Sequence, residues 1–300
     1  MRESIKKTIL FPCHPLNTKE VYPDFLNEYN VARLVGFDIM LIDLDKLDDD
    51  NEVVIRGLSE PQPSSLDIMR ESYPIIYRGW MLSDDRYEHL YNFLKGNDYY
   101  LITPPENYNI CHYFPYVYEF IEEHTPKAVW MTDLSELESK ARSLGTDMIM
   151  KDFVKSDKGL EGINRINKKI FAAELKSMAE DFIIKRGKLF NKGIVLKEFV
   201  ELKKYEGEVN EFRSFVISVG PLVNAIVTNR NSNIKGEVNT PPPEWIRDIA
   251  DNIPSAFFTI DVAEKEDGSW IVIETGDGQV SGLSPGQNPI DIFNYLSVVY

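Results

Sequence analysis

Short apolar runs alternate with amphipathic segments along the first third of the chain. The apolar runs have the length and β-branched content of buried strands and lie at residues 7–12, 37–43, 53–57, 74–77 and 99–102. The amphipathic segments 24–34 and 84–95 end near Gly36 and Gly96, as helices commonly do. The pattern therefore predicts an α/β domain, in which ligands bind beyond the carboxyl ends of the strands.

Arg78 lies at one of these strand ends, in the sequence Tyr-Arg-Gly-Trp-Met. Its guanidinium is a candidate to bind a substrate carboxylate or a phosphate, and the alternative is an exposed loop arginine. The aromatic segment at residues 108–118 is either a packing element or part of a pocket wall. The pattern does not decide between these two interpretations.

The next part of the chain is predicted to contain a strand at 127–131, a helix at 133–144, a strand at 146–154 and a long scaffold helix at 164–186. Lys151 interrupts the apolar strand. Burying its ammonium group without a partner would cost several kcal/mol, so an anion is expected beside it. The alternative is a lysine that extends to solvent from the strand end.

A short loop follows this strand and contains Lys155, Lys158 and Gly159. The loop could fold over phosphates, although it has too few glycines for a P-loop. The strand that starts at Gly193 ends in Lys-Glu-Phe-Val-Glu, which alternates apolar and charged residues.

Residues 211–230 read as a hairpin with a type II′ turn at Gly220-Pro221. The register predicted from this turn pairs Glu211 with Arg230 and Arg213 with Thr228, so both arginines would emerge on one side. Two arginine forks on one face suit phosphate oxygens. The alternative is a Glu211–Arg230 surface ion pair, which would contribute less than about 1 kcal/mol.

The last hairpin has strands at 257–262 and 270–275 around Asp267-Gly268, a pair suited to a two-residue type I′ turn. Counting back from this turn places Asp261 opposite Glu274. Directly opposed carboxylates repel one another, so a cation is expected between them, and Mg²⁺ accepts one or two carboxylates together with substrate phosphates. Asp277 is a third candidate ligand. The alternative is a solvated strand end.

Length and charge restrict the class of protein. The chain has 300 residues, 43% of them hydrophobic, and a net charge of −15. It is therefore expected to fold into two or three subdomains, and its charge disfavours nucleic acid and anionic membranes as partners. No apolar run reaches the roughly 18 residues of a membrane span, and the start has too short an apolar core for a signal peptide. These features predict a cytoplasmic protein.

Taken in order, these motifs resemble the ATP-grasp fold, and two arginines with one lysine resemble its R2K clade. The matching sequences are Thr-Asp-Met-Ile-Met-Lys around Lys151, Leu-Lys-Glu-Phe-Val-Glu at 196–201, Glu-Phe-Arg at 211–213, and the pair Asp261 and Glu274. The resemblance implies mixed α/β and α+β architecture. It predicts a Rossmann-like domain at 1–125, an N-lobe at 126–200 and a C-lobe at 201–300.

The resemblance also assigns roles to individual residues. Lys151 would contact the phosphates of the nucleotide, and Lys155 and Lys158 would cover them. Glu198 and Val200 would bind the adenine, and Glu201 would bind the ribose. Arg213, Arg230 and Lys151 would act on the transferring γ-phosphoryl, and Asp261, Glu274 and Asp277 would bind Mg²⁺. Two departures matter. Many members of the family have Glu-x-Asn at this point, but here Glu274 is followed by Thr275 and Gly276, so the second metal ligand would shift to Asp277. A second lysine upstream of Lys151 is not evident, and Lys127 is the nearest candidate.

The implied activity is ATP- and Mg²⁺-dependent ligation of a carboxylate to an amine through an acyl phosphate, with an amino acid or peptide as substrate. Metal and arginines would neutralise charge on the transferred phosphoryl, while the closed site excludes water. Two alternatives remain: a kinase that uses the same phosphate site, and a noncatalytic protein that binds nucleotide or a partner.

Overall fold

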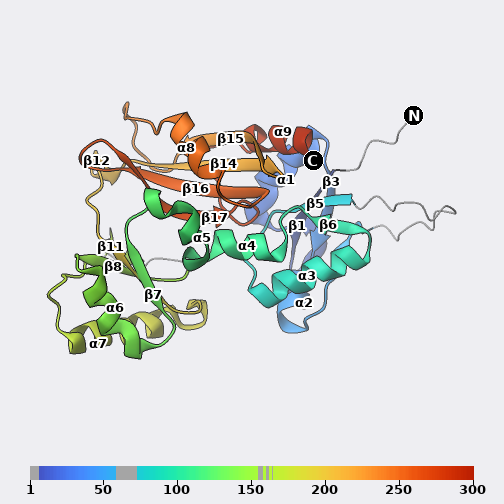
Figure 1. Ribbon diagram of the computed structural model, residues 1–300. Coiled ribbons are helices and arrows are strands. Elements are labelled where there is room, and N and C mark those ends of the chain that lie inside the picture. Colours follow the sequence, from blue (N-terminus) through green and yellow to red (C-terminus); the bar gives the residue numbers. More distant parts are fainter. Residues whose placement is uncertain (1–6, 59–72, 155–157, 160–161, 164) are drawn as a thin grey trace.

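A six-stranded sheet forms the N-terminal part of the fold (Figure 1), in the computed structural model that describes residues 7–58, 73–154, 158–159, 162–163 and 165–300. Its strand order is β4-β3-β1-β5-β6, with β2 paired to β1. The parallel strands are β1 (Thr8–His14), β3 (Asp38–Ile42), β5 (Tyr73–Tyr77) and β6 (Tyr99–Leu101). Two short strands pair antiparallel to their neighbours: β2 (Asn17–Val21) with the end of β1, and β4 (Ile55–Arg56) with β3 at one edge.

Helices cover both faces of this sheet because successive residues of β1 point to opposite sides. Ile9 and Phe11 pack in a core shared with α1 (Leu26–Val35) and the C-terminal helix α9 (Ile290–Val299). Leu10 packs in a second core with α2 (Leu44–Asp49) and α3 (Asp84–Gly96). Strands buried on both faces explain the continuous apolar runs in the sequence.

A three-stranded antiparallel sheet, ordered β7-β11-β8, forms the second part. Its strands are β7 (Ala128–Met131), β8 (Met148–Asp152) and β11 (Ile194–Glu198), and α6 (Leu137–Leu144) and α7 (Ala172–Arg186) pack on one face. The opposite face carries Lys151 and Lys197, which share it because Val195 pairs with Lys151 and Lys197 with Ile149. The short strands β9 (Lys158–Gly159) and β10 (Gly162–Ile163) pair with one another.

The long helix predicted from residue 164 is wrong at its start, because α7 begins at Ala172. Ile166 instead forms a β-bridge with Met148. Asp147 holds this segment through hydrogen bonds from the Arg165 side chain at 2.8 Å and the Lys168 backbone N–H at 3.0 Å. Helical periodicity alone does not reveal this competing partner.

A four-stranded antiparallel sheet, ordered β15-β14-β16-β17, forms the C-terminal part. Its strands are β14 (Glu211–Val219), β15 (Leu222–Arg230), β16 (Phe257–Glu264) and β17 (Trp270–Asp277). One face packs on α8 (Pro243–Ala250) and on α4 (Pro105–His112) and α5 (Phe114–Ile121), and part of the other face packs on α9. The small strands β12 (Lys204–Tyr205) and β13 (Glu208–Val209) form a separate ribbon.

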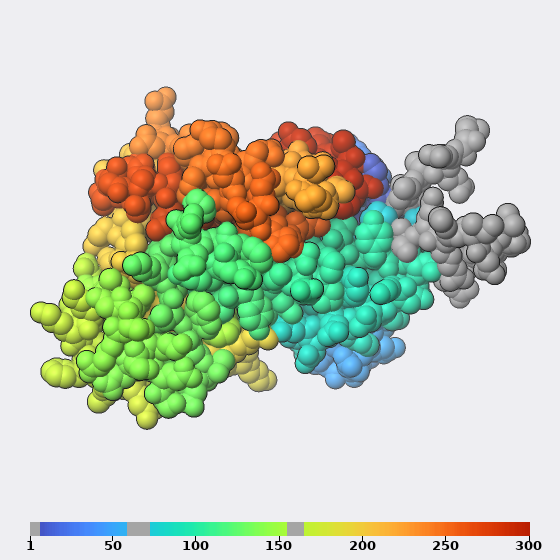
Figure 2. All heavy atoms as spheres, in the orientation of Figure 1, coloured from blue at the N-terminus to red at the C-terminus, as the bar shows by residue number. Residues whose placement is uncertain are grey.

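The aromatic segment 108–118 packs against the three sheets and also forms part of the wall of a surface pocket, so both interpretations of this segment are confirmed. It forms α4 and the start of α5, beside β17 (Figure 1). Cys111 and Val117 pack on the C-terminal sheet, and Phe114 packs beside Val195 of β11. Figure 2 shows the blue-cyan, green and orange-red parts of the chain as adjoining blocks. Four 3₁₀ turns complete the described structure, at Pro23–Phe25, Glu122–His124, Leu134–Glu136 and Gly187–Leu189.

Candidate functional site

The predicted pairing of Asp261 with Glu274 is confirmed, although the turn is not the predicted one. Lys265 and Ser269 close a three-residue loop through a backbone hydrogen bond of 2.8 Å, and Gly268 takes a φ of 82°. This is a longer turn than type I′ and shifts the register by one residue. A bulge at Ile273 shifts it back, because Val262 pairs with Val272 while Asp261 pairs with Glu274.

Arg213 supplies the positive charge beside the two carboxylates. Its Nε and Nη2 donate to the two oxygens of Asp261 at 2.7 and 2.6 Å, and its Nη1 donates to the Gly282 carbonyl at 2.9 Å. Burial lowers the pKa of Arg213, but the hydrogen bonds and charge of Asp261, with the charge of Glu274, raise the pKa above its usual value. The opposed acids therefore lie beside a bidentate arginine from β14.

The prediction that Arg213 and Arg230 share one face is wrong. Arg213 pairs with Asn229, and Phe212 pairs with Arg230, so the two arginines lie on opposite faces of the sheet. The turn at Gly220-Pro221 is confirmed, with Val219 paired to Leu222. The error arises from a bulge beside Ile217 that inserts one extra residue into β15, a feature that counting from a turn does not anticipate.

Arg230 holds a neighbouring loop. Its Nη1 donates to the carbonyls of Ile234 and Gly236 at 2.6 and 3.0 Å. Glu211, its predicted partner, accepts instead from the Asn231 side chain at 2.7 Å. The alternative interpretation, a Glu211–Arg230 surface ion pair, is therefore also wrong.

Two buried lysines converge on one aromatic ring. Lys151 on β8 is 2% exposed, and its Nζ lies 5.2 Å from the centre of the Phe114 ring. Lys197 on β11 is 3% exposed, and its Nζ lies 4.7 Å from the same centre. The Nζ of Lys197 also donates to the Ile273 carbonyl, at 2.9 Å, and so reaches the hairpin that carries Glu274.

Sequence reasoning gave no role to Lys197. Burial, followed by the charge of Lys151, moves the pKa of Lys197 well below its usual value, and the charge of Glu274 opposes this shift. The available signal was a lone lysine in an apolar strand, the same signal that singled out Lys151. It was missed because Lys197 lies next to an alternating charged stretch.

The candidate nucleoside residues lie at the end of β11. Glu198 and Val200 are partly buried. Glu201 lies outside on the surface, where its carboxylate pairs with Arg165 at 3.0 Å and its side chain is 67% exposed. Lys158 belongs to β9, and Lys155 lies outside the described residues.

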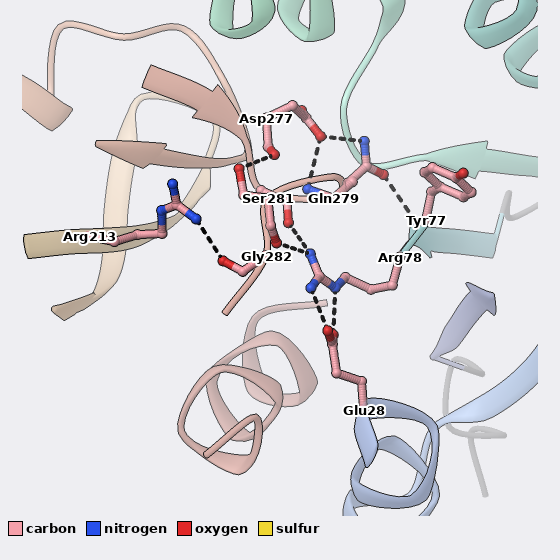
Figure 3. A network of polar contacts seen from close by, with 9 residues as sticks. Glu28, Tyr77, Arg78, Arg213, Asp277, Gln279, Ser281 and Gly282 are labelled. Carbon is pink, nitrogen blue, oxygen red and sulfur yellow. Dashed lines mark hydrogen bonds and ion pairs between the residues drawn. The ribbon is translucent and has the colours of Figure 1, made fainter. Parts of the chain in front are cut away.

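Asp277 does not join Asp261 and Glu274. It pairs with Phe258, which places it on the other face of the hairpin, and it is fully buried. Its Oδ1 accepts from the backbone N–H and the side-chain amide of Gln279, at 2.9 and 3.1 Å (Figure 3). Within the part of the chain that the structure describes, no group of three or more His, Cys, Asp or Glu residues is arranged to hold a metal. The prediction of Asp277 as a third metal ligand is therefore wrong.

Burial raises the pKa of Asp277 to about 7, although hydrogen bonds from Gln279 and the charge of Arg78 lower it. The amide of Gln279 continues the network by donating to the Tyr87 hydroxyl at 2.7 Å. Its Oε1 accepts from the Tyr77 backbone N–H at 3.1 Å. This buried network joins the end of β17 to the N-terminal sheet.

Arg78 is also structural, and its predicted exposure to substrate is wrong. It is 2% exposed, and its Nε and Nη2 donate to the Glu28 carboxylate, each at 2.8 Å. Its Nη1 donates to the carbonyls of Gly278 and Ser281 (Figure 3). Arg78 thus ties the loop after β17 to α1, while Arg213 contacts the same loop at Gly282.

The sequence of the second half of the chain matches a known protein family. Residues 139–296 match the profile of the ATP-grasp domain, R2K clade family 3. The chain belongs to this ATP-grasp family. Comparison with curated protein sequences gave no match.

Solved structures carry the same fold along nearly the whole chain. A RimK domain ATP-grasp protein from Sphaerobacter thermophilus DSM 20745 is 13% identical with a TM-score of 0.60, and 98% of each chain is covered. D-alanyl-alanine synthetase A from Vibrio cholerae O1 biovar eltor str. N16961 is 10% identical with a TM-score of 0.57, again covering 98% of each chain.

N5-carboxyaminoimidazole synthetase from Staphylococcus aureus, solved with ADP, is 13% identical with a TM-score of 0.59, and 99% of this chain and 78% of that chain are covered. At these identities the likeness establishes the mixed α/β ATP-grasp fold. None of the described helices of this ATP-grasp protein is long and apolar enough to span a membrane.

Proposed function

We propose that this ATP-grasp protein is an ATP- and Mg²⁺-dependent ligase that joins a carboxylate to an amine. One observation carries the proposal: Lys197 brings the Lys151 face of β8 and β11 against the hairpin of Asp261 and Glu274. A cationic surface and an acidic pair thus meet between two sheets. A triphosphate with its metal needs both, since Lys151 suits phosphate and the acids suit Mg²⁺.

Lys151 is the residue best suited to the phosphates. Its ammonium is buried over Phe114 and has no ion pair with any described carboxylate. A buried ammonium without an anion costs several kcal/mol, and a bound phosphate would offset that cost. Lys155 and Lys158 are proposed to cover the phosphates, and Glu198 and Val200 to bind the adenine. The ribose role of Glu201 would require its pair with Arg165 to open.

Asp261 and Glu274 fit a magnesium ion by the chemistry of their oxygens. Mg²⁺ is usually bound by one or two carboxylates together with phosphate and water, so a third protein ligand is unnecessary. When bound, the metal would neutralise charge on the phosphates. Arg213 would then share Asp261 with the metal and place its remaining N–H groups toward the γ-phosphoryl.

The proposed chemistry has two transfers. A substrate carboxylate oxygen bonds to the γ-phosphorus while the bond to ADP breaks, which gives an acyl phosphate and ADP. The amine nitrogen then bonds to the acyl carbon, phosphate leaves, and the amine loses a proton. The protein orients the reactants, excludes water, and uses Arg213 and Lys151 to stabilise the phosphoryl charge.

The domain scheme is part of the same proposal. Residues 1–125 would form a Rossmann-like domain, residues 126–200 an N-lobe and residues 201–300 a C-lobe. The parallel order of β3, β1, β5 and β6 supports the first assignment. Arg230 is left out of the phosphoryl site because it lies on the face opposite Arg213.

A coupled assay tests this function. The protein with ATP and Mg²⁺ is screened against amino acids and peptides, and ADP release and product mass are recorded. The expected result is one ADP for each product, with a product mass equal to both substrates minus one water. A phosphorylated acceptor would establish a kinase instead, and nucleotide binding without turnover under any substrate would contradict the ligase. Lys151→Met is the inactive control.

A further inference from the structure

Lys197 crosses from the three-stranded sheet to an edge strand of the C-terminal sheet. Its Nζ donates to the Ile273 carbonyl at 2.9 Å, and the side chain is 3% exposed. An edge strand such as β17 presents backbone groups that its own sheet leaves unpaired. Lys197 therefore satisfies a carbonyl of β17 from another part of the fold.

Ile273 is the residue on which the register of the acidic pair depends. On the turn side of the bulge Val262 pairs with Val272, and beyond it Asp261 pairs with Glu274, which leaves Ile273 as the extra residue. Without the bulge, the three-residue turn would place Ile273 opposite Asp261. Glu274 would then lie opposite Ile260, a fully buried residue of the apolar core on the other face.

The two carbonyls at the bulge are both reached from outside the sheet. The Thr125 hydroxyl donates to the Val272 carbonyl at 2.9 Å, and Lys197 donates to the next carbonyl along the strand. In a regular strand successive carbonyls point to opposite sides, so two adjacent outward carbonyls mark the distorted backbone of a bulge. Of the two donors, Lys197 contacts the extra residue itself.

We propose that Lys197 is a positioning residue that holds the Ile273 bulge and thereby keeps Glu274 opposite Asp261 for the metal of a bound nucleotide. This inference rests on the proposed function. Lys197 acts through the backbone of β17, whereas Lys151 acts on the phosphates. Removal of the Lys197 amine should therefore weaken the binding of Mg²⁺ with the nucleotide and leave the metal-independent part of nucleotide binding intact.

Thr125→Val provides a matched control, because it removes a hydrogen bond of the same length from the adjacent carbonyl and leaves the bulge contact in place. AMPPNP is the probe, and its affinity is measured calorimetrically over a series of Mg²⁺ concentrations and without Mg²⁺. In Lys197→Met, the Mg²⁺ concentration that gives half of the Mg²⁺-dependent gain in AMPPNP affinity, here called the midpoint, should rise about tenfold. This change corresponds to about 1.4 kcal/mol, the size of one hydrogen bond. Thr125→Val should keep the wild-type midpoint, and Lys197→Arg, which retains N–H donors, should keep it as well.

Two outcomes would overturn the inference. An unchanged midpoint in Lys197→Met would show that the lysine does not set the metal site. A loss of metal-free AMPPNP affinity in that variant would show that Lys197 contacts phosphate directly. Wild-type protein that binds no AMPPNP would contradict the proposed function, which is a separate result.

Hydrogen exchange on the protein without nucleotide tests the bulge itself. The amides of residues 273–275 should exchange at least tenfold faster in Lys197→Met than in wild type or Thr125→Val. Equal rates in all three proteins would overturn the inference whatever the nucleotide does. Because the substitution replaces a buried amine by an apolar side chain of similar length, the fold should be retained.

Discussion

Asp277→Asn should change the pH dependence of stability in a direction that separates a buried acid from a metal ligand. Oδ2 of Asp277 and the Thr103 hydroxyl are both buried, and the Thr103 hydroxyl is one of the groups that lower the pKa of this carboxyl against the effect of burial. The carboxyl is fully buried, and burial raises its pKa from 3.8 to about 7. An asparagine keeps the oxygen that accepts from Gln279 and carries no charge at any pH.

The raised pKa of Asp277 determines the direction in which the stability of the wild type changes with pH. Between about pH 4 and pH 7 the folded protein keeps a proton that the unfolded chain has released. The stabilisation is therefore fully present below the unfolded pKa of 3.8 and is lost as the pH rises through the folded pKa near 7. A shift of about three units corresponds to about 4 kcal/mol, or about 1.4 kcal/mol per pH unit inside the window.

Urea denaturation of wild type and Asp277→Asn at pH 5, 6, 7 and 8 measures this difference. The variant should gain stability relative to wild type as the pH rises, with most of the gain reached by pH 7 to 8. The stabilisation of the variant by Mg-ATP should equal that of wild type. A difference that does not change with pH would mean that Asp277 is ionised throughout, as a metal ligand would be, and would refute the buried-acid interpretation.

Three further substitutions test the roles of the cations. Lys151→Met should abolish the thermal shift given by Mg-ATP and leave the melting temperature without ligand within a few degrees in scanning calorimetry, whereas the exposed control Lys140→Met should keep the shift; a retained shift in Lys151→Met would exclude a phosphate role. Arg213→Lys should lower kcat far more than ATP affinity, because lysine loses the two-pronged contact, and equal losses in steady-state kinetics and calorimetry would indicate ground-state binding alone. Arg78→Met should cost about 3–5 kcal/mol in urea denaturation because Glu28 loses its partner in a buried pair, and a loss below about 1 kcal/mol would contradict that structural role.

Local patterns predicted most of the elements that position the site. Apolar runs predicted the strands of the N-terminal sheet except β2, whose residues Asn17–Val21 are mostly polar, and the lone lysine in an apolar strand located Lys151. These signals work because a strand buried on one or both faces leaves a direct record of its burial in the sequence. The extended structure around Ile166 was not predicted, because it depends on a bridge to Met148, which lies on another strand.

Register was harder to predict, because a single bulge reverses which face a side chain occupies. In the last hairpin, the longer turn shifts the register by one residue and the bulge at Ile273 shifts it back. The pairing of Asp261 with Glu274 was therefore predicted correctly although the turn type was not. In the arginine hairpin one bulge was not compensated, and Arg213 and Arg230 were wrongly placed together. Nothing local in the sequence marks either bulge.

The sequence also could not show that two charged residues are buried where separate parts of the fold meet. Arg78 reads as a ligand-binding residue at a strand end, but its partner Glu28 and its carbonyl acceptors after β17 lie far away along the chain. Asp277 was likewise predicted to be a metal ligand because the N-terminal sheet that buries it is distant in the sequence. Both residues hold the C-terminal hairpin against the N-terminal sheet, and only the tertiary arrangement reveals this.

The central claim is that Asp261 and Glu274 bind the metal of a nucleotide whose phosphates contact Lys151. Chemical denaturation of wild type and Glu274→Gln, each with and without Mg-ATP, tests it most directly. Without ligand the two proteins should agree within about 0.5 kcal/mol, because Arg213 already offsets much of the repulsion between the opposed acids. With Mg-ATP at 100 times its Kd, wild type should gain about 2.7 kcal/mol and Glu274→Gln should lose most of that gain. Full ligand-induced stabilisation of Glu274→Gln would contradict the claim.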